Sequence, residues 1–230
     1  VLAGLATVAD SHPDVRLTVS VSASERFNGD LSSRQHLPMT LGDFYARLRP
    51  ALDGAAAASD APRLYLAQCS FVRAEGAADL PQLAAHVPRP AMVPPSVTEA
   101  NLWASPVRTR TNLHYDARHN LLVVVAGEKQ VTLFSPAATP LLKPLPLFGD
   151  SGNHSSVDAF SLAGSDLDAK AVRLLVRAGD GVFIPEGWWH AVDSSPGTVA
   201  VNFWWQGIHT TVTAPDVAPY ALRVALQSEV

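Results

Sequence analysis

The sequence contains a single cysteine, Cys69, among its 230 residues. One cysteine excludes a disulfide framework within the chain, and such scarcity is typical of a reducing compartment. We therefore expect a nuclear or cytoplasmic location. Apolar residues flank Cys69 on both sides, which predicts that its thiol is buried in a strand. A chain of this length can bury a full hydrophobic core without disulfides.

Long apolar runs are also missing. No segment approaches the roughly 20 apolar residues that cross a bilayer, and the N-terminus lacks the basic and apolar regions of a secretory signal, so we expect no membrane partner. Charged residues make up 17% of the chain and the formal net charge is −4, whereas nucleic-acid surfaces are normally basic. Nucleic acid is not favoured as a partner, although Arg108 and Arg110 are close enough in sequence for a local basic patch.

The second half of the chain is dominated by short apolar runs between turn formers. Runs of this kind are typical of a sandwich or barrel. They cover residues 101–105, 111–116, 120–125, 129–134, 171–176, 181–185 and 199–205. Gly127 and the segment 179–181 predict hairpin turns between neighbouring runs. The polar stretch 137–170 is read as a long insertion, and insertions of that length are often functional.

The first half predicts fewer strands. The β-branched segments 15–21 and 63–72 predict strands, whereas residues 24–38 are polar and rich in turn formers. Thr40 is placed to cap a helix over residues 41–52. Residues 75–98 hold five prolines and predict a connecting loop with one short helix.

His114-Tyr115-Asp116 brings an imidazole and a carboxylate to one face of a predicted strand, because residues i and i+2 point the same way. His190 follows the predicted strand 181–185, which can lie beside the first in an antiparallel barrel. Two histidines and one carboxylate on one side of a metal leave the opposite positions open, as in non-haem Fe(II) oxygenases. In isolation such a His-x-Asp pair is more often a coincidence, with the second histidine in the core. The surrounding segments decide the matter.

Those segments resemble the JmjC family. The similar stretches are TNLHYDARHNLLVVVAGEKQVTLFSP at 111–136, RAGDGVFIPEGWWHAVDSSPGTVAVNFWWQG at 177–207 and RLYLAQ at 63–68. NHSSVD at 153–158 is similar to plant members. Together the matches cover most of residues 40–210. They point to the small JmjC-only, or cupin-8, group, which includes the asparaginyl hydroxylase of the hypoxia pathway.

The resemblance implies a mainly β fold with flanking helices, a double-stranded β-helix (jelly-roll, cupin-like) barrel. We expect a single domain over residues 1–230. An N-terminal buttress of helices and strands would occupy about 1–98, the catalytic barrel about 99–210, and the start of a C-terminal helix 214–230. Relatives of this type often dimerise through C-terminal helices, so a homodimer is among the expected partners.

The resemblance also implies roles for individual residues. His114, Asp116 and His190 match the iron ligands and form the catalytic centre. Lys129, thirteen residues after Asp116, matches the lysine that pairs with the distal carboxylate of 2-oxoglutarate. An ammonium group can bind that carboxylate as a point charge. The alternative for Lys129 is a solvated lysine in a hairpin.

Further residues are expected around the co-substrate. Thr111 matches a hydroxyl donor to the distal carboxylate, and Tyr65 matches a phenol that reaches it from the other side. The set beside the metal and the co-substrate is Asn120, Asn202 and Trp204. Trp188, Trp189 and Trp205 are expected in the core and the pocket wall. The remaining histidines show no ligand spacing and are expected on the surface or in loops: His12, His36, His86, His119, His154 and His209.

The implied cofactors are Fe(II), 2-oxoglutarate as co-substrate and O2, with ascorbate as reductant in vitro. The implied reaction hydroxylates a protein or peptide side chain, or demethylates it through hydroxylation of an N-methyl carbon, and releases succinate and CO2. A hydroxylase is favoured over a demethylase because the chain shows no reader module or zinc-binding cysteines. Three alternatives stay open: an oxygenase acting on a modified tRNA base, a non-catalytic cupin-like binding protein, and an isomerase or dioxygenase of the wider cupin class.

Overall fold

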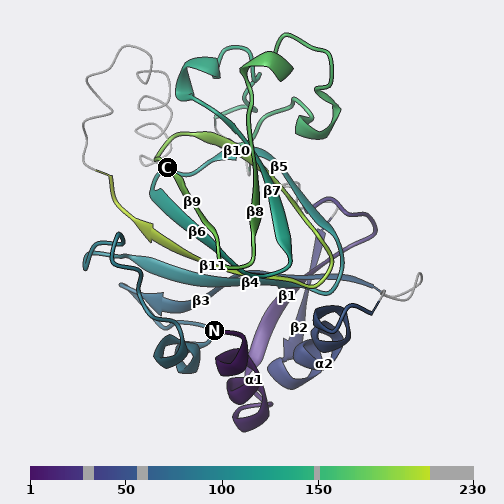
Figure 1. Cartoon of the computed structure of the whole chain (residues 1–230), viewed down its shortest axis with the longest axis vertical. Coiled ribbons are helices and arrows are strands. Elements are labelled where there is room, and N and C mark those ends of the chain that lie inside the picture. The colour runs from purple at the N-terminus through teal and green to yellow at the C-terminus, as the bar shows by residue number, and fades with distance from the viewer. Residues whose placement is uncertain (28–33, 56–61, 148–150, 208–230) are drawn as a thin grey trace.

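The computed structural model describes residues 1–27, 34–55, 62–147 and 151–207, and within them the chain is mainly β (Figure 1). The helices are α1 (Leu2–Ser11), α2 (Leu41–Leu52) and four short 3-10 helices, η1 (Pro81–His86), η2 (Pro136–Ala138), η3 (Ala159–Ser161) and η4 (Asp168–Lys170). The strands are β1 (Arg16–Ser22), β2 (Arg34–Thr40), β3 (Arg63–Arg73), β4 (Glu99–Ser105), β5 (Thr109–Tyr115), β6 (His119–Ala126), β7 (Glu128–Phe134), β8 (Val172–Arg177), β9 (Gly181–Ile184), β10 (Trp189–Ser194) and β11 (Thr198–Trp205).

The described strands form two antiparallel sheets that face each other. The larger sheet has the order β2-β1-β3-β4-β11-β6-β9 and the smaller one the order β5-β10-β7-β8. From β4 onward the chain passes repeatedly from one sheet to the other, so four strands of each sheet enclose the barrel. This is the predicted jelly-roll architecture, with β1, β2 and β3 extending one side of the larger sheet.

The two glycine turns predicted as hairpins connect the sheets instead. Gly127 joins β6 of the larger sheet to β7 of the smaller sheet, and the turn around Asp180 joins β8 to β9 in the same manner. Gly127 has a φ of +71°, and a Cβ there would lie 2.5 Å from Thr198 Oγ1, which requires glycine. Turn residues signal that the chain reverses, but they do not say which sheet the next strand joins.

The N-terminal helices and η1 cover the face of the larger sheet that points away from the barrel (Figure 1). Helix α2 begins as predicted, because the Thr40 side chain accepts a hydrogen bond from the Asp43 backbone N–H at 3.1 Å. Its Phe44 and Leu48 are buried. The predicted strands at 15–21 and 63–72 correspond to β1 and β3 within one residue at each end.

Two elements differ from the expectation. Strand β2 occupies part of the segment expected to hold turn formers, because it is an edge strand that pairs only with β1 and needs no apolar face. Its Pro38 is tolerated at such an edge. Helix α1 has no counterpart among the predicted helices, yet Leu5 and Val8 are buried against the larger sheet.

The long insertion 137–170 begins within η2, also contains η3 and η4, and lies at the top of the smaller sheet, apart from three residues outside the described ranges (Figure 1). The helix predicted over 214–230 and His209 lie outside the described residues. No described helix is long and apolar enough to cross a membrane.

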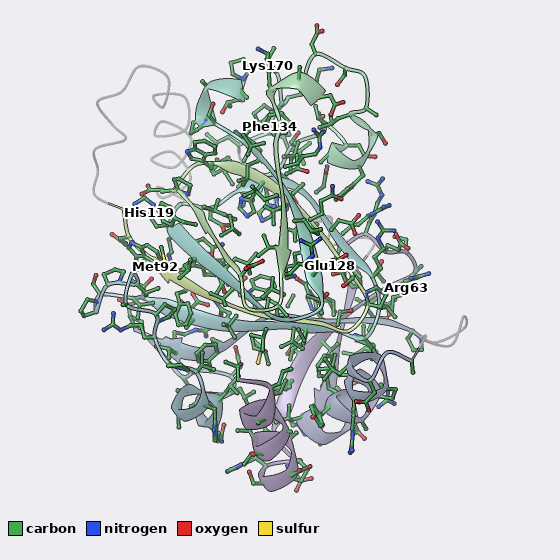
Figure 2. All side chains as sticks on the ribbon, viewed as in Figure 1. Arg63, Met92, His119, Glu128, Phe134 and Lys170 are labelled. Carbon is green, nitrogen blue, oxygen red and sulfur yellow. The ribbon has the colours of Figure 1, made fainter. Side chains whose placement is uncertain are left out.

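The main hydrophobic core lies between the larger sheet and the helices, and it contains Cys69 as predicted. A second cluster lies under the insertion, where Trp189 and Tyr115 meet edge to face with ring centroids 4.8 Å apart. Phe134 points into this interior, whereas Met92 and Lys170 lie at the periphery (Figure 2). The larger sheet is therefore anchored on its outer face, and its inner face is free to form a site.

Candidate metal centre

The three predicted metal ligands come together inside the barrel. His114 in β5 and His190 in β10 are direct partners in the antiparallel register, and Asp116 follows immediately after β5. One potential ligand atom from each side chain lies within 4.8 Å of the other two, and His190 Nε2 is 3.7 Å from Asp116 Oδ2. The strand pairing therefore brings His190 next to His114 and Asp116, although His190 lies far from them in the sequence.

Both imidazoles are oriented by backbone carbonyls. His114 Nδ1 lies 2.9 Å from the Asn112 carbonyl oxygen, and His190 Nδ1 lies 3.1 Å from that of Trp188. A carbonyl oxygen only accepts, so each Nδ1 carries a proton, and in the neutral imidazole Nε2 is the atom that can bind a metal. Metal-binding histidines are held in this way.

Burial keeps His190 uncharged. The pKa of His190 is lowered to about 4, chiefly by burial and also by the neighbouring His114, although Asp116 and the hydrogen bond to the Trp188 carbonyl act in the opposite direction. At neutral pH the imidazole is therefore the free base, which is the form that binds a metal ion.

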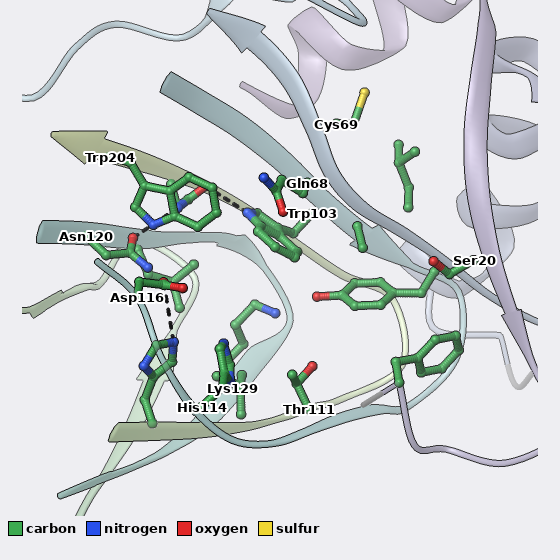
Figure 3. A pocket seen from close by; sticks show the side chains of 18 of the residues that line it. Ser20, Gln68, Cys69, Trp103, Thr111, His114, Asp116, Asn120, Lys129 and Trp204 are labelled. Atoms are coloured by element: carbon green, nitrogen blue, oxygen red, sulfur yellow. Dashed lines mark hydrogen bonds and ion pairs between the residues drawn. The ribbon is translucent and has the colours of Figure 1, made fainter. Parts of the chain in front are cut away.

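The triad lines a cavity of about 480 Å³ between the two sheets. Every other residue predicted for the co-substrate lines the same cavity: Tyr65, Thr111, Asn120, Lys129, Asn202 and Trp204. Figure 3 shows Lys129 and Thr111 on the same side as His114, with Trp204 and Trp103 across the cavity from them. The structure therefore brings the whole predicted set together.

Lys129 is buried, with 3% of its surface exposed. Its ammonium donates a hydrogen bond to Ser194 Oγ at 2.8 Å, and no carboxylate of the described residues lies within ion-pair distance. Burial lowers the pKa of Lys129 to about 8. An ammonium group buried without a counter-charge is costly, and a bound anion would remove that cost.

A row of amides lies on the opposite wall. Asn202 Oδ1 accepts from Trp103 Nε1 at 2.8 Å and from Asn101 Nδ2 at 3.2 Å, and Asn202 Nδ2 donates to Asn120 Oδ1 at 3.0 Å. Trp204 is also buried, and its Nε1 has no hydrogen-bond partner among the residues that the structure describes. Asn202 is thus held by three hydrogen bonds in an otherwise apolar strand, as a buried amide requires.

A family model described as a cupin-like domain matches residues 4–211. The chain belongs to this cupin-like domain family. The fold and the position of the triad inside the barrel agree with that membership, and they confirm the family resemblance read from the sequence.

Several curated relatives of this cupin-like protein carry JmjC-type names, and others are named for tRNA wybutosine synthesis. A lysine-specific demethylase of Arabidopsis thaliana is 34% identical over 222 residues, which is 86% of this chain and 40% of that protein. A human bifunctional peptidase and (3S)-lysyl hydroxylase is 31% identical over 60% of this chain and 51% of its own length. Human tRNA wybutosine-synthesizing protein 5 is 40% identical over 40% of this chain and 29% of its own length. The chain spans about half or less of the length of these relatives.

One histidine expected on the surface or in a loop lines the cupin-like site. His154 of the insertion lies stacked on His114, with ring centroids 5.3 Å apart and planes 19° apart, and it lines the cavity. The pair is brought together by an isolated bridge between the insertion and β5. Ligand spacing gives no signal for this contact, whereas the resemblance at 153–158 marks the segment. His119 is likewise half-buried in β6, where its Nδ1 accepts from the Glu186 N–H at 3.0 Å.

Arg108 and Arg110 do not form a free basic patch. Arg108 binds Asp193 through Nε and Nη2 at 2.8 and 2.6 Å, and Arg110 binds the same carboxylate through Nε at 2.9 Å. Glu25 lies within ion-pair distance of both arginines. The two positive charges are therefore matched by two negative ones.

Proposed function

We propose that this protein is an Fe(II)- and 2-oxoglutarate-dependent oxygenase that oxidises a protein side chain. The proposal is carried by one observation. A His-Asp-His group shares a cavity with a buried lysine that has no counter-charge among the described residues. Two imidazole nitrogens and one carboxylate oxygen are the donor set of Fe(II) oxygenases, and the lysine supplies a site for a dicarboxylate.

One group of residues would bind the metal at one end of the cavity, and another would bind the co-substrate carboxylate at the other end. His114, Asp116 and His190 would hold the iron, which supplies the activation of O2 and the oxidation of a C–H bond, coupled to conversion of 2-oxoglutarate into succinate and CO2. Lys129 would bind the distal carboxylate through a charge-assisted hydrogen bond, with hydroxyl groups of Thr111 and Tyr65 beside it. Partial exclusion of water from the cavity would strengthen each of these contacts.

A protein substrate is supported by the names of two relatives, a lysine-specific demethylase and a lysyl hydroxylase. The relative named for tRNA wybutosine synthesis supports the tRNA alternative. The net charge of −4 and the pairing of Arg108 and Arg110 with acids count against a nucleic-acid surface.

The first test is co-substrate turnover. Purified protein would be supplied with Fe(II), ascorbate, O2 and 2-oxoglutarate, and the formation of succinate would be followed. We expect slow turnover without a protein substrate, its loss in His114→Ala, and a raised KM for 2-oxoglutarate in Lys129→Ala. The matched control is Lys170→Ala, because Lys170 is exposed and lies outside the cavity.

A negative result has a definite meaning. Absence of succinate, combined with absence of metal-dependent 2-oxoglutarate binding in a calorimeter, would contradict the oxygenase and favour a cupin-like binding protein. If turnover is found, the same assay with lysine peptides and with tRNA separates the two substrate classes, because the true substrate accelerates succinate formation.

A further inference from the structure

The position of Asp116 relative to His190 is not fixed by strand register alone. His114 and His190 are register partners, but Asp116 follows the end of β5. The segment 116–119 leads from Asp116 into β6, and the turn 185–188 leads from β9 into β10, which carries His190. The distance between the two ligands therefore also depends on how this segment and this turn contact each other.

Two hydrogen bonds join the segment 116–119 to the turn 185–188. The Gly187 backbone N–H donates to the Asp116 backbone carbonyl oxygen at 3.0 Å, and the Glu186 backbone N–H donates to His119 Nδ1 at 3.0 Å. The first bond uses only backbone atoms, so it places little demand on the sequence. The second bond needs an acceptor in the side chain at position 119.

The turn itself supplies no acceptor for these two N–H groups. The Trp188 N–H donates to the Pro185 carbonyl oxygen at 3.1 Å and closes the turn, and Gly187 has a φ of +79°, which favours glycine. A turn closed in this way uses its first carbonyl and its last N–H, so the N–H groups of its two central residues need acceptors outside it. His119 and the Asp116 carbonyl provide them.

The His119 ring is held as an acceptor. A backbone N–H only donates, so Nδ1 of His119 carries a lone pair, and in the neutral ring the proton is on Nε2. His114 and His190 have the opposite arrangement, because their Nδ1 atoms face backbone carbonyls. The rings of Phe183 in β9 and Trp205 in β11 lie with centroids 5.4 and 5.7 Å from that of His119. Strand β6 lies between those two strands, so the imidazole is contacted from both sides.

His119 therefore acts on the metal ligands only through the backbone. It lies at the margin of the barrel (Figure 2) and is not among the residues that line the cavity. Its bond to the turn holds together the two stretches of chain whose side chains bring His190 Nε2 and Asp116 Oδ2 to 3.7 Å. Without that bond, only the Gly187–Asp116 backbone bond of this pair would remain.

We propose that His119 is a positioning residue, which fixes the separation of Asp116 and His190 by accepting the Glu186 N–H and thereby raises the affinity of the triad for a metal ion. Loss of groups that hold metal ligands in place typically lowers metal affinity by about 10- to 100-fold. The inference rests on the proposed function in one respect, because it takes the His-Asp-His group as a metal site. It requires neither 2-oxoglutarate nor turnover.

The test measures Co(II) binding by calorimetry and by the visible absorption of the bound ion. His119→Leu occupies similar space and removes the acceptor. His119→Asn keeps one, because its Oδ1 is bonded to Cγ as Nδ1 is in histidine. We expect the Co(II) affinity to fall about tenfold in His119→Leu and to stay within about twofold of the wild-type value in His119→Asn. The visible spectrum of the bound ion should change in the first variant and return in the second.

Phe183→Leu is the matched control, because it removes a ring that packs on His119 and leaves the acceptor in place. It should lower the stability of the metal-free protein in urea and keep the Co(II) affinity. Equal losses of affinity in Phe183→Leu and His119→Leu would assign the effect to packing. Unchanged affinity in folded His119→Leu would show that the bond does not position the ligands. Either result would overturn the inference.

The outcomes also separate this inference from the proposed function. If the wild-type protein binds Co(II), loses that binding in His114→Ala and yet forms no succinate when supplied with Fe(II) and 2-oxoglutarate, the proposed function fails and the role of His119 stands. Failure of the wild-type protein to bind Co(II) would overturn both.

Discussion

Lys129 and Ser194 are register partners in the β7–β10 pair, and the buried ammonium donates to the Ser194 hydroxyl over 2.8 Å. A hydroxyl satisfies one of the three ammonium hydrogens but does not neutralise the charge. For this reason burial lowers the pKa of Lys129 to about 8. The charge of the cavity therefore changes close to physiological pH.

The affinity for 2-oxoglutarate should depend on pH through this lysine. Below about pH 8 Lys129 is protonated and attracts the carboxylate. Above that value the free protein loses the proton, so the affinity should fall by up to about tenfold per pH unit. Calorimetric titrations between about pH 7 and about pH 10 measure this. Lys129→Arg keeps its charge at all of these values and should show no such decline; an equally flat wild-type profile would contradict the prediction.

Metal binding should stabilise the fold. An ion that binds only the native state raises the free energy of unfolding by about 2.7 kcal/mol at a hundredfold excess over its Kd. We expect Fe(II) or Zn(II) to raise the Tm of the wild-type protein and to leave the Tm of His114→Ala unchanged. His12→Ala is the control, because His12 is exposed and remote from the cavity. Equal shifts in all three proteins would place the bound metal elsewhere.

Asp193 should be the most sensitive carboxylate for stability. Burial alone would raise the pKa of Asp193, but the hydrogen bonds from Arg108 and Arg110 outweigh it and hold the pKa below its ordinary value. Asp193→Asn should therefore lower the free energy of unfolding by about 2 kcal/mol at pH 7. The wild-type advantage should shrink as the pH falls through the native pKa, where the carboxylate is protonated.

Urea unfolding at neutral and acid pH measures this difference. The matched control is Asp168→Asn, because Asp168 pairs with Arg173 in an exposed position and exposed ion pairs contribute little. If both variants lost equal stability, the carboxylate between Arg108 and Arg110 would have no special role.

Cys69 should resist thiol reagents in the folded protein. Burial and, to a smaller extent, the nearby Asp79 carboxylate raise the pKa of Cys69 to about 12, against the opposing effect of Arg73. Only the thiolate reacts, so labelling at pH 8 should be at least about a hundredfold slower than in urea. The chain has one thiol, which makes the measurement unambiguous. Equal labelling rates in both conditions would show that the thiol is accessible.

The parts of the site predicted from sequence are those fixed by local geometry or by a long motif. The i, i+2 spacing put His114 and Asp116 on one face, and the resemblance added His190, Lys129 and the amides. His154 escaped prediction because its contact depends on how the insertion returns to β5. The spacing of residues along the sequence does not predict this contact between the insertion and β5.

In the fold, too, elements with local sequence signals were predicted, whereas elements that depend on distant strands were not. Helix α2 was predictable because its cap and apolar face are local signals. Strand β2 was not, because an exposed edge strand has no apolar alternation to recognise. The turn at Gly127 was recognised as a reversal, yet its passage between sheets depends on pairing with strands far away in the sequence.

The register of β5 and β10 determines whether the metal ligands meet. His114 and His190 meet because they are opposite each other in this pair, and a slip of one residue would turn one imidazole to the other side of the sheet. A metal ion would then bind at this triad only in chains whose β5 and β10 have paired in the correct register. Metal uptake during refolding would therefore report on barrel closure. Chains with a shifted β5–β10 register would bind no metal at this triad and would consume neither oxygen nor co-substrate.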